Sequence, residues 1–205
     1  MYLTKLELEL SRRYVREAIL NKQKLHSLVS GLFGLQRKDS ETLFCKKICG
    51  TKLYIYTYSN QPVKTMNILP GMSLIAQRNI SDLFGTVEEG QKLGFQLQTM
   101  PFKKVVSEGK KNSRRKALLT TEERLSWLNR KAEQAGFLIL NVTENQGEII
   151  HARHSEEKGG ELTMKSWCYI GQLQITNKDS FCRSLCNGIG PGKAYGLGML
   201  IISRG

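Results

Sequence analysis

The chain has 205 residues, enough for one large domain or two small ones, and 40% of them are hydrophobic, so disorder is not the expectation. Its formal net charge of +13, from 31 Lys and Arg against 18 Asp and Glu, attracts polyanions over a long range, and nucleic acid is the commonest such partner. The alternative is that the excess charge only keeps the protein in solution.

Export and membrane insertion are not expected. Residues 1–10 are interrupted by Lys5, Glu7 and Glu9, so they lack the apolar run of a signal peptide. No apolar stretch approaches the ~20 residues of a membrane span. The sequence therefore predicts a cytoplasmic protein whose five cysteines are reduced thiols, mostly buried.

The spacing of the possible metal ligands argues against a metal site. Two cysteine pairs, Cys45/Cys49 and Cys182/Cys186, have the i,i+4 spacing that places both sulfurs on one face of a helix. Structural zinc sites normally contain CxxC knuckles, which the chain lacks, and the aspartates form no DxD or DExH pattern. We therefore expect no metal and no other cofactor.

The first half of the chain predicts the order strand, helix, strand, strand, short helix, strand. Residues 1–10 alternate in polarity as a half-buried strand does, and residues 11–20 form a basic, partly helical connection. Asn21 is a candidate N-cap for a helix that runs to about Phe33 and stops at Gly34. The other elements expected here are strands at residues 42–48, 52–59 and 72–80 and a short helix within residues 62–69.

A linker at residues 81–90 separates this half from a second, similar order. Thr121 is the candidate N-cap of the strongest helix, which Gly136 ends. The other elements expected here are a strand at residues 92–100, a polar, basic loop at 101–119, a strand at 137–142, a hairpin of 148–154 and 162–175 with its tip near Lys158-Gly159-Gly160, a helix at 179–187 and a last strand at 195–203.

The repeated order predicts an α+β fold of two tandem βαββαβ units, each with its helices on one face of an antiparallel sheet. This is the ferredoxin-like arrangement, which RRM domains share. We expect an N-terminal domain at residues 1–84 and a C-terminal domain at residues 91–205.

Residues 101–116 form the most basic segment, with seven Lys and Arg against one acid, Glu108. Clusters of this density, interspersed with small residues, usually contact phosphates, and a solvated loop is the alternative. The residues we expect to bind phosphate are Lys110, Lys111, Arg114 and Arg115.

A glycine-rich segment lies close to the C-terminus, with five glycines in residues 188–198. It is not a P-loop, because Ala194 stands where that motif needs a Ser or Thr to bind magnesium. Glycines let a backbone approach a ligand closely, so we predict RNA binding at Gly190, Gly192 and Lys193. The alternative is a tight turn that returns the last strand to its sheet.

Tyr54, Tyr56 and Tyr58 fall on one face of an expected strand, a geometry on which bases can stack. In the alternative interpretation these rings face the helices or partly cover the sheet.

His26 is the most suggestive of the three histidines. On a helix it falls at the edge of the apolar stripe that contains Leu25 and Val29, so it is neither fully buried nor fully free. Histidine titrates near neutral pH and can move a proton, which makes His26 a candidate general acid or base. The alternative is an ordinary interfacial histidine.

These features together resemble the CasE family, the CRISPR repeat-processing endoribonucleases of the type I-E system. The resemblance runs from the first residue to the last strand, and the glycine-rich segment is its most specific part. The residues that carry it are Met1 to Leu6, Leu25-His26, Gly109-Lys110-Lys111, Trp127 to Lys131, Ala135-Gly136-Phe137 and Gly188 to Gly196.

The resemblance implies tandem ferredoxin-like domains that cleave precursor CRISPR RNA at the base of a repeat stem-loop. Cleavage would need no metal and would leave a 5′-hydroxyl and a cyclic or 3′-phosphate. The family's histidine falls on His26, and some members also use a Tyr three residues earlier, where this chain has Gln23, so the residue that assists His26 stays open. The family's groove-inserting hairpin corresponds to residues 148–165, with the candidates Arg153, His154, Lys158 and Lys165.

The resemblance also implies partners. The protein would stay bound to the mature guide RNA, together with other subunits of a type I-E surveillance complex, and no membrane is involved. The alternative function is that of a ferredoxin-like RNA-binding subunit without cleavage activity, which would share every basic feature described above.

Overall fold

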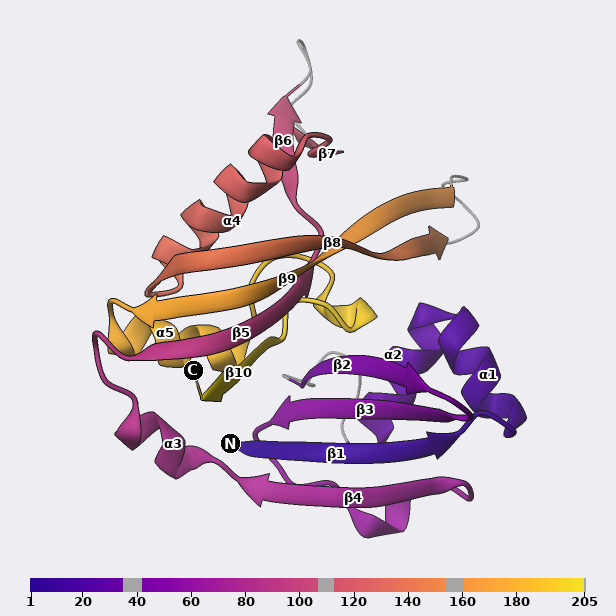
Figure 1. The fold of residues 1–205 in the computed structure, drawn as a ribbon. Helices are drawn as coiled ribbons and strands as arrows, with labels where there is room; N and C mark the ends of the chain where they lie inside the picture. The colour runs from indigo at the N-terminus through magenta and orange to yellow at the C-terminus, as the bar shows by residue number, and fades with distance from the viewer. Residues whose placement is uncertain (35–41, 107–112, 154–160, 205) are drawn as a thin grey trace. The chain divides into compact units, whose positions relative to one another are not determined.

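The computed structural model describes residues 1–34, 42–106, 113–153 and 161–204, and it contains two four-stranded antiparallel sheets (Figure 1). Contacts divide the chain into two compact units. The first unit comprises residues 1–87, 185–188 and 192–199, and the second comprises residues 88–184, 189–191 and 200–205. The predicted α+β fold of two tandem ferredoxin-like domains is confirmed.

The first unit carries the sheet with strand order β2-β3-β1-β4, in which every neighbouring pair is antiparallel. Its elements are β1 (Tyr2–Glu9), α1 (Arg13–Leu20), α2 (Lys22–Gly31), β2 (Leu43–Cys49), β3 (Lys52–Ser59), the 3₁₀ turn η1 (Thr65–Asn67), β4 (Met72–Asn79), α3 (Ser81–Thr86) and the 3₁₀ turn η3 (Lys193–Tyr195).

The core of this unit lies between one face of the sheet and helices α1 and α2 (Figure 1). The alternation of residues 1–10 is confirmed, because Leu6 and Leu8 are fully buried. Asn21 caps α2 as predicted, and its side-chain oxygen accepts the backbone N–H groups of Gln23 at 3.0 Å and Lys24 at 3.2 Å. This cap sets the start of the helix that carries His26.

The expected linker at residues 81–90 is partly wrong, because residues 81–86 form the short helix α3. The side-chain oxygen of Asn79 accepts the backbone N–H of Ser81 at 3.0 Å, and the Thr86 hydroxyl donates to the carbonyl of Leu83 at 3.0 Å. These side chains supply hydrogen-bond partners for backbone groups at the two ends of α3. The helix was not predicted because it contains Gly85, a residue typical of loops.

The second unit carries the sheet with strand order β10-β5-β9-β8, again antiparallel throughout. Its elements are β5 (Lys92–Thr99), β6 (Phe102–Val106), β7 (Ser113–Ala117), α4 (Thr121–Gln134), β8 (Phe137–Arg153), β9 (Glu161–Ile175), most of α5 (Lys178–Asn187) and β10 (Leu200–Arg204). When only the four strands of this sheet are numbered in chain order, their order is the same as in the first sheet.

The expected loop at residues 101–119 is wrong where the structure describes it. Strands β6 and β7 pair in an antiparallel hairpin, from Phe102 opposite Ala117 to Val106 opposite Ser113. A two-stranded ribbon of this kind has no sheet face to bury, so its sequence need not alternate between apolar and polar residues. The basic character of the segment therefore concealed its strands.

Three boundaries also differ from the expectation. The N-cap of α4 is Thr120 and not Thr121, since the Thr120 hydroxyl accepts the backbone N–H of Glu123 at 3.2 Å. The strand expected at residues 137–142 continues to Arg153 as one long strand. The last strand starts at Leu200, because the glycines at 196 and 198 have positive φ angles of +79° and +81°, which an extended strand does not accommodate.

One buried ion pair connects α4 to the sheet of the second unit. The guanidinium of Arg124 donates to both carboxylate oxygens of Glu144 on β8, at 2.8 and 2.6 Å, and to the carbonyl of Leu119 at 2.6 Å. It also lies 3.5 Å from the ring centroid of Trp167 on β9. The Glu144 carboxylate raises the pKa of Arg124, which therefore stays charged although it is buried.

Candidate functional site

His26 lies half-buried on α2 of the first unit, and two neighbours hold its ring. Its Nδ1 is 3.2 Å from the hydroxyl of Ser30, one helical turn further on, and Ser30 is only 4% exposed. The ring of Phe44 on β2 meets the imidazole edge to face, with centroids 6.4 Å apart and an interplanar angle of 82°. Ser30 and Phe44 therefore orient the imidazole through a polar and an aromatic contact.

The glycine-rich segment brings a second group to the same place. Its 3₁₀ turn η3 packs against α2 and β2 within the first unit. At Gly196 an added Cβ would lie 2.8 Å from Phe44 Cε2, so the backbone here lies directly against the ring that contacts His26. The exposed Lys193 belongs to this turn. The structure thus brings His26 and the segment of Gly192 and Lys193 together.

Gly190 belongs to the second unit and has a φ of +82°. An added Cβ there would lie 3.0 Å from the indole of Trp127, which is 3% exposed, and the Thr99 hydroxyl donates to the carbonyl of Ile189 at 3.4 Å. Close packing and backbone conformation both require glycine at this position. The alternative interpretation, in which the segment forms structural turns, therefore has direct support. The role of the segment in RNA binding stays a prediction.

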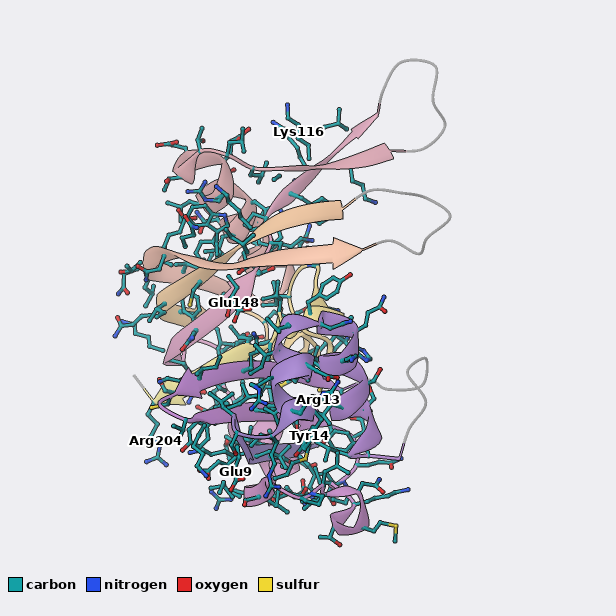
Figure 2. All side chains as sticks on the ribbon, turned by 90° about the vertical axis from the view of Figure 1, so that its right-hand side faces the viewer. Glu9, Arg13, Tyr14, Lys116, Glu148 and Arg204 are labelled. Atoms are coloured by element: carbon teal, nitrogen blue, oxygen red, sulfur yellow. The ribbon has the colours of Figure 1, made fainter. Side chains whose placement is uncertain are left out.

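Most of the predicted phosphate-binding side chains lie outside the part of the chain that the structure describes. Lys110, Lys111, His154 and Lys158 lie outside the described residues. Only the backbones of Arg114 and Arg115 on β7 and of Arg153 on β8 are described. Lys165 is exposed on β9, and the exposed Lys116 side chain extends from β7 (Figure 2).

Basic residues occupy directly opposed positions on the two strands of the β6–β7 hairpin. Lys103 pairs with Lys116 across the ribbon, and Lys104 pairs with Arg115 in the same register. Directly opposed residues of an antiparallel pair lie on one face, where like charges destabilise the ribbon. The Lys103 ammonium lies 2.8 Å from the carboxylate of Glu123 on α4, which offsets part of this charge. Such a surface favours a polyanionic ligand.

The tyrosines of β3 lie on the sheet face opposite the helices, because Leu53 and Ile55 fill the helix face. The interpretation that they face the helices is wrong. The Lys5 ammonium lies 4.8 Å from the ring centroid of Tyr54 and 5.7 Å from that of Tyr56, so these ring faces are engaged by a cation. Tyr58 is buried, which raises its pKa to about 12.

The expectation of mostly buried cysteines is also wrong. Cys45, Cys168 and Cys182 are half-buried, while Cys49 and Cys186 are exposed. Burial raises the pKa of the Cys45 thiol to about 12, so it stays protonated at neutral pH. Within the described part of the chain no three His, Cys, Asp or Glu side chains gather as a metal site would require. The helices in the same part of the chain are too short or too polar to cross a membrane.

Sequence reasoning placed Ser30 near His26 on the helix but assigned it no role, and it did not identify Phe44. The spacing of Ser30, four residues after His26 on a predicted helix, was a usable signal, because such residues face each other. Phe44 reaches the site from another strand, and nothing in the local sequence indicates that contact.

Comparison with known proteins gives consistent results. The model of a family described as CRISPR associated protein matches residues 1–204. The CRISPR-associated endoribonuclease Cse3 of Thermus thermophilus is 31% identical over 126 residues, 57% of this chain, and the match spans only 58% of the length of that relative. A structure of CRISPR endoribonuclease Cse3 bound to a 19-nucleotide RNA superposes with a TM-score of 0.86 at 25% identity, over 100% of both chains. Thermus thermophilus Cse3, bound to an RNA representing a pre-cleavage complex, superposes with a TM-score of 0.80 at 22% identity, over 99% of this chain and 98% of that one.

Proposed function

Because the chain belongs to the CRISPR-associated protein family, we propose that it is a metal-independent endoribonuclease that cleaves precursor CRISPR RNA within its repeats. The observation that carries this proposal is His26, held by Ser30 and Phe44 beside the turn that contains Lys193. The name of the T. thermophilus relative supports the same activity. The protein then stays bound to the mature guide RNA.

The reaction is an attack by the 2′-hydroxyl oxygen of one nucleotide on its own 3′-phosphorus. The bond from phosphorus to the 5′-oxygen breaks, which leaves a 2′,3′-cyclic phosphate, or the 3′-phosphate after its hydrolysis, and a 5′-hydroxyl. The attack needs a proton removed from the 2′-hydroxyl, and the departure needs a proton given to the 5′-oxygen. His26 performs one of these transfers, and the contact of its Nδ1 with Ser30 orients the ring.

Lys22, Lys24 or Lys193 could stabilise the negative charge of the pentavalent phosphorane, and among the described side chains Lys193 is the best suited. It is exposed and lies on the turn that packs against α2. Lys24 is less suited, because its ammonium is 2.7 Å from the carboxylate of Glu17. Gln23 is exposed at the position where some members of the family use Tyr, and its amide has no pKa that would allow proton transfer at neutral pH.

The basic groups of the second half of the chain position the RNA in this proposal. They bind a repeat stem-loop mainly through its phosphates, which gives affinity with little dependence on the catalytic group. The residues proposed for RNA binding are Lys110, Lys111, Arg114, Arg115, Arg153, Lys158, Lys165, Gly190, Gly192 and Lys193. We also propose that residues 1–84 and 91–205 are the two domains, that the protein is cytoplasmic, and that it joins other subunits of a type I-E surveillance complex.

Incubation with the repeat RNA in EDTA tests the proposal. We expect cleavage, with 5′-hydroxyl and cyclic or 3′-phosphate ends, and no cleavage of an RNA that lacks the 2′-hydroxyl at the scissile nucleotide. Cleavage of that deoxy RNA, or a requirement for added magnesium, would exclude the mechanism. Tight binding without any cleavage would identify the chain as the non-catalytic RNA-binding subunit, for which the Gln23 substitution is the motivating observation.

A further inference from the structure

The second unit contains a cleft of ≈ 570 Å³ between β6, α4 and residues 189–191. Four cationic residues line it: Lys103 and Lys104 from β6, and Arg130 and Lys131 from α4. Among the described residues that line it there is no carboxylate. A concave site of this size and charge fits a small anionic group better than a flat duplex surface.

Two of the four cations are already engaged within the protein. The Lys103 ammonium lies 2.8 Å from the Glu123 carboxylate, and the Lys131 ammonium donates to the side-chain oxygen of Gln134 at 2.8 Å. Lys104 and Arg130 are exposed, and neither forms an ion pair with any of the residues that the structure describes. These two side chains are therefore the ones with charge to offer a ligand.

The remaining wall of the cleft is apolar and aromatic. Phe102 and Trp127 line it together with Gly190 and Pro191. An added Cβ at Gly190 would point inward, at the Thr99 hydroxyl and the buried indole of Trp127, so the backbone of Gly190 lies directly against that ring. A pocket that combines cations with aromatic and backbone surface suits a nucleotide, whose phosphate and base have these complementary properties.

Resting on the proposed function, we infer that this cleft binds one unpaired nucleotide of the RNA outside the repeat stem. Lys104 and Arg130 hold its phosphate, and its base lies against the wall of Phe102 and Gly190. A paired nucleotide is excluded, because a stacked base pair presents only its edges and phosphates to a protein. An acidic protein segment would match the charge but would make no use of the aromatic wall.

The test compares two RNAs with the same repeat stem-loop, each carrying a 2′-deoxy nucleotide at the scissile position to prevent cleavage. One is trimmed to the stem-loop, and the other keeps its single-stranded flanks. Fluorescence anisotropy gives the dissociation constant of each RNA for the wild-type protein, Arg130→Gln and Lys104→Gln. Arg183→Gln is the matched control, since Arg183 is an exposed helical arginine of the same unit outside the cleft.

We expect the wild-type protein to bind the flanked RNA more tightly than the trimmed one. Arg130→Gln should weaken binding of the flanked RNA about tenfold, the value of one charge-assisted hydrogen bond, and leave binding of the trimmed RNA unchanged. Arg130→Lys should retain most of the affinity, and Arg183→Gln should behave as wild type. A melting curve for each variant confirms that it is folded.

Equal weakening of both RNAs would overturn the inference, because Arg130 would then contact the stem. An unchanged affinity for the flanked RNA in both cleft variants would also overturn it and would leave an acidic protein segment as the ligand to test. The outcome is separable from the proposed function, which depends on whether the wild-type protein cuts the same stem-loop with its 2′-hydroxyl restored.

Discussion

The imidazole of His26 sits at the centre of the proposed chemistry, and its removal should separate cleavage from binding. A general acid or base contributes about 10²–10⁴-fold to the rate, so His26→Ala should lower single-turnover cleavage by that factor. Affinity for the stem-loop should stay near the wild-type value, because phosphate contacts elsewhere supply it. Cleavage by the variant at the wild-type rate would disprove the assignment.

Ser30 positions His26 through its contact with Nδ1. Ser30→Ala should slow cleavage about three- to tenfold, which corresponds to the net free energy of one hydrogen bond, and should shift the pH–rate profile. Ser30→Thr keeps the hydroxyl and should restore most of the rate. The control is Ser27→Ala, at an exposed position of the same helix, which should change neither the rate nor the profile.

At the scale of whole elements, the glycine-rich segment combines a strained backbone with a close contact. Gly196 has a φ of +79°, and an added Cβ would lie 2.8 Å from Phe44. Gly196→Ala should therefore destabilise the protein by about 1–3 kcal/mol in urea unfolding and should also slow cleavage, since Phe44 holds His26.

Gly31→Ala is the matched control for this substitution. Gly31 ends helix α2, and an added Cβ there would meet no atom within 4 Å. Its substitution should leave stability unchanged or raise it by about 0.4–1 kcal/mol. If Gly196→Ala were as stable as Gly31→Ala, the turn would not pack closely against Phe44.

The elements that the sequence predicted well are those whose pattern reflects burial on one face. Residues 1–10 alternate between apolar and polar because one side of β1 faces α1 and α2. Asn21 predicts the start of α2 because its side chain caps the helix. The β6–β7 hairpin was missed because its described side chains at residues 103–105 and 116–117 are exposed, so its residues carry charge instead of an apolar periodicity. The last strand was predicted to start at residue 195 and starts at Leu200, because apolar residues continue through 195–199 and only the positive φ angles of Gly196 and Gly198 exclude an extended strand there.

The candidate site was predictable only where local sequence carries the information. The helix and the edge position of His26 follow from residue spacing within one turn. Phe44 and the cleft of the second unit depend on residues far apart in the chain, which a single sequence does not relate. The contact of Lys5 with two tyrosines likewise arises from pairing of β1 with β3.

For the molecule as a whole, a net charge of +13 makes RNA binding dependent on salt. Each neutralised phosphate should contribute about −0.9 to the slope of log K against log salt, by analogy with B-DNA. Replacing Lys111, Arg114 and Arg115 together by Ala should flatten the measured slope. An unchanged slope would show that these residues stay solvated in the complex.

The buried contact of Arg124 has a consequence for the thermodynamics of RNA binding. Its guanidinium joins Leu119, two residues after the end of the β6–β7 hairpin, to β8 in the free protein, through the carbonyl of Leu119 and the carboxylate of Glu144. The base of the hairpin is therefore ordered before any ligand arrives, and this part of the protein has little conformational entropy left to lose. We therefore expect association at this surface to carry only a small conformational-entropy penalty.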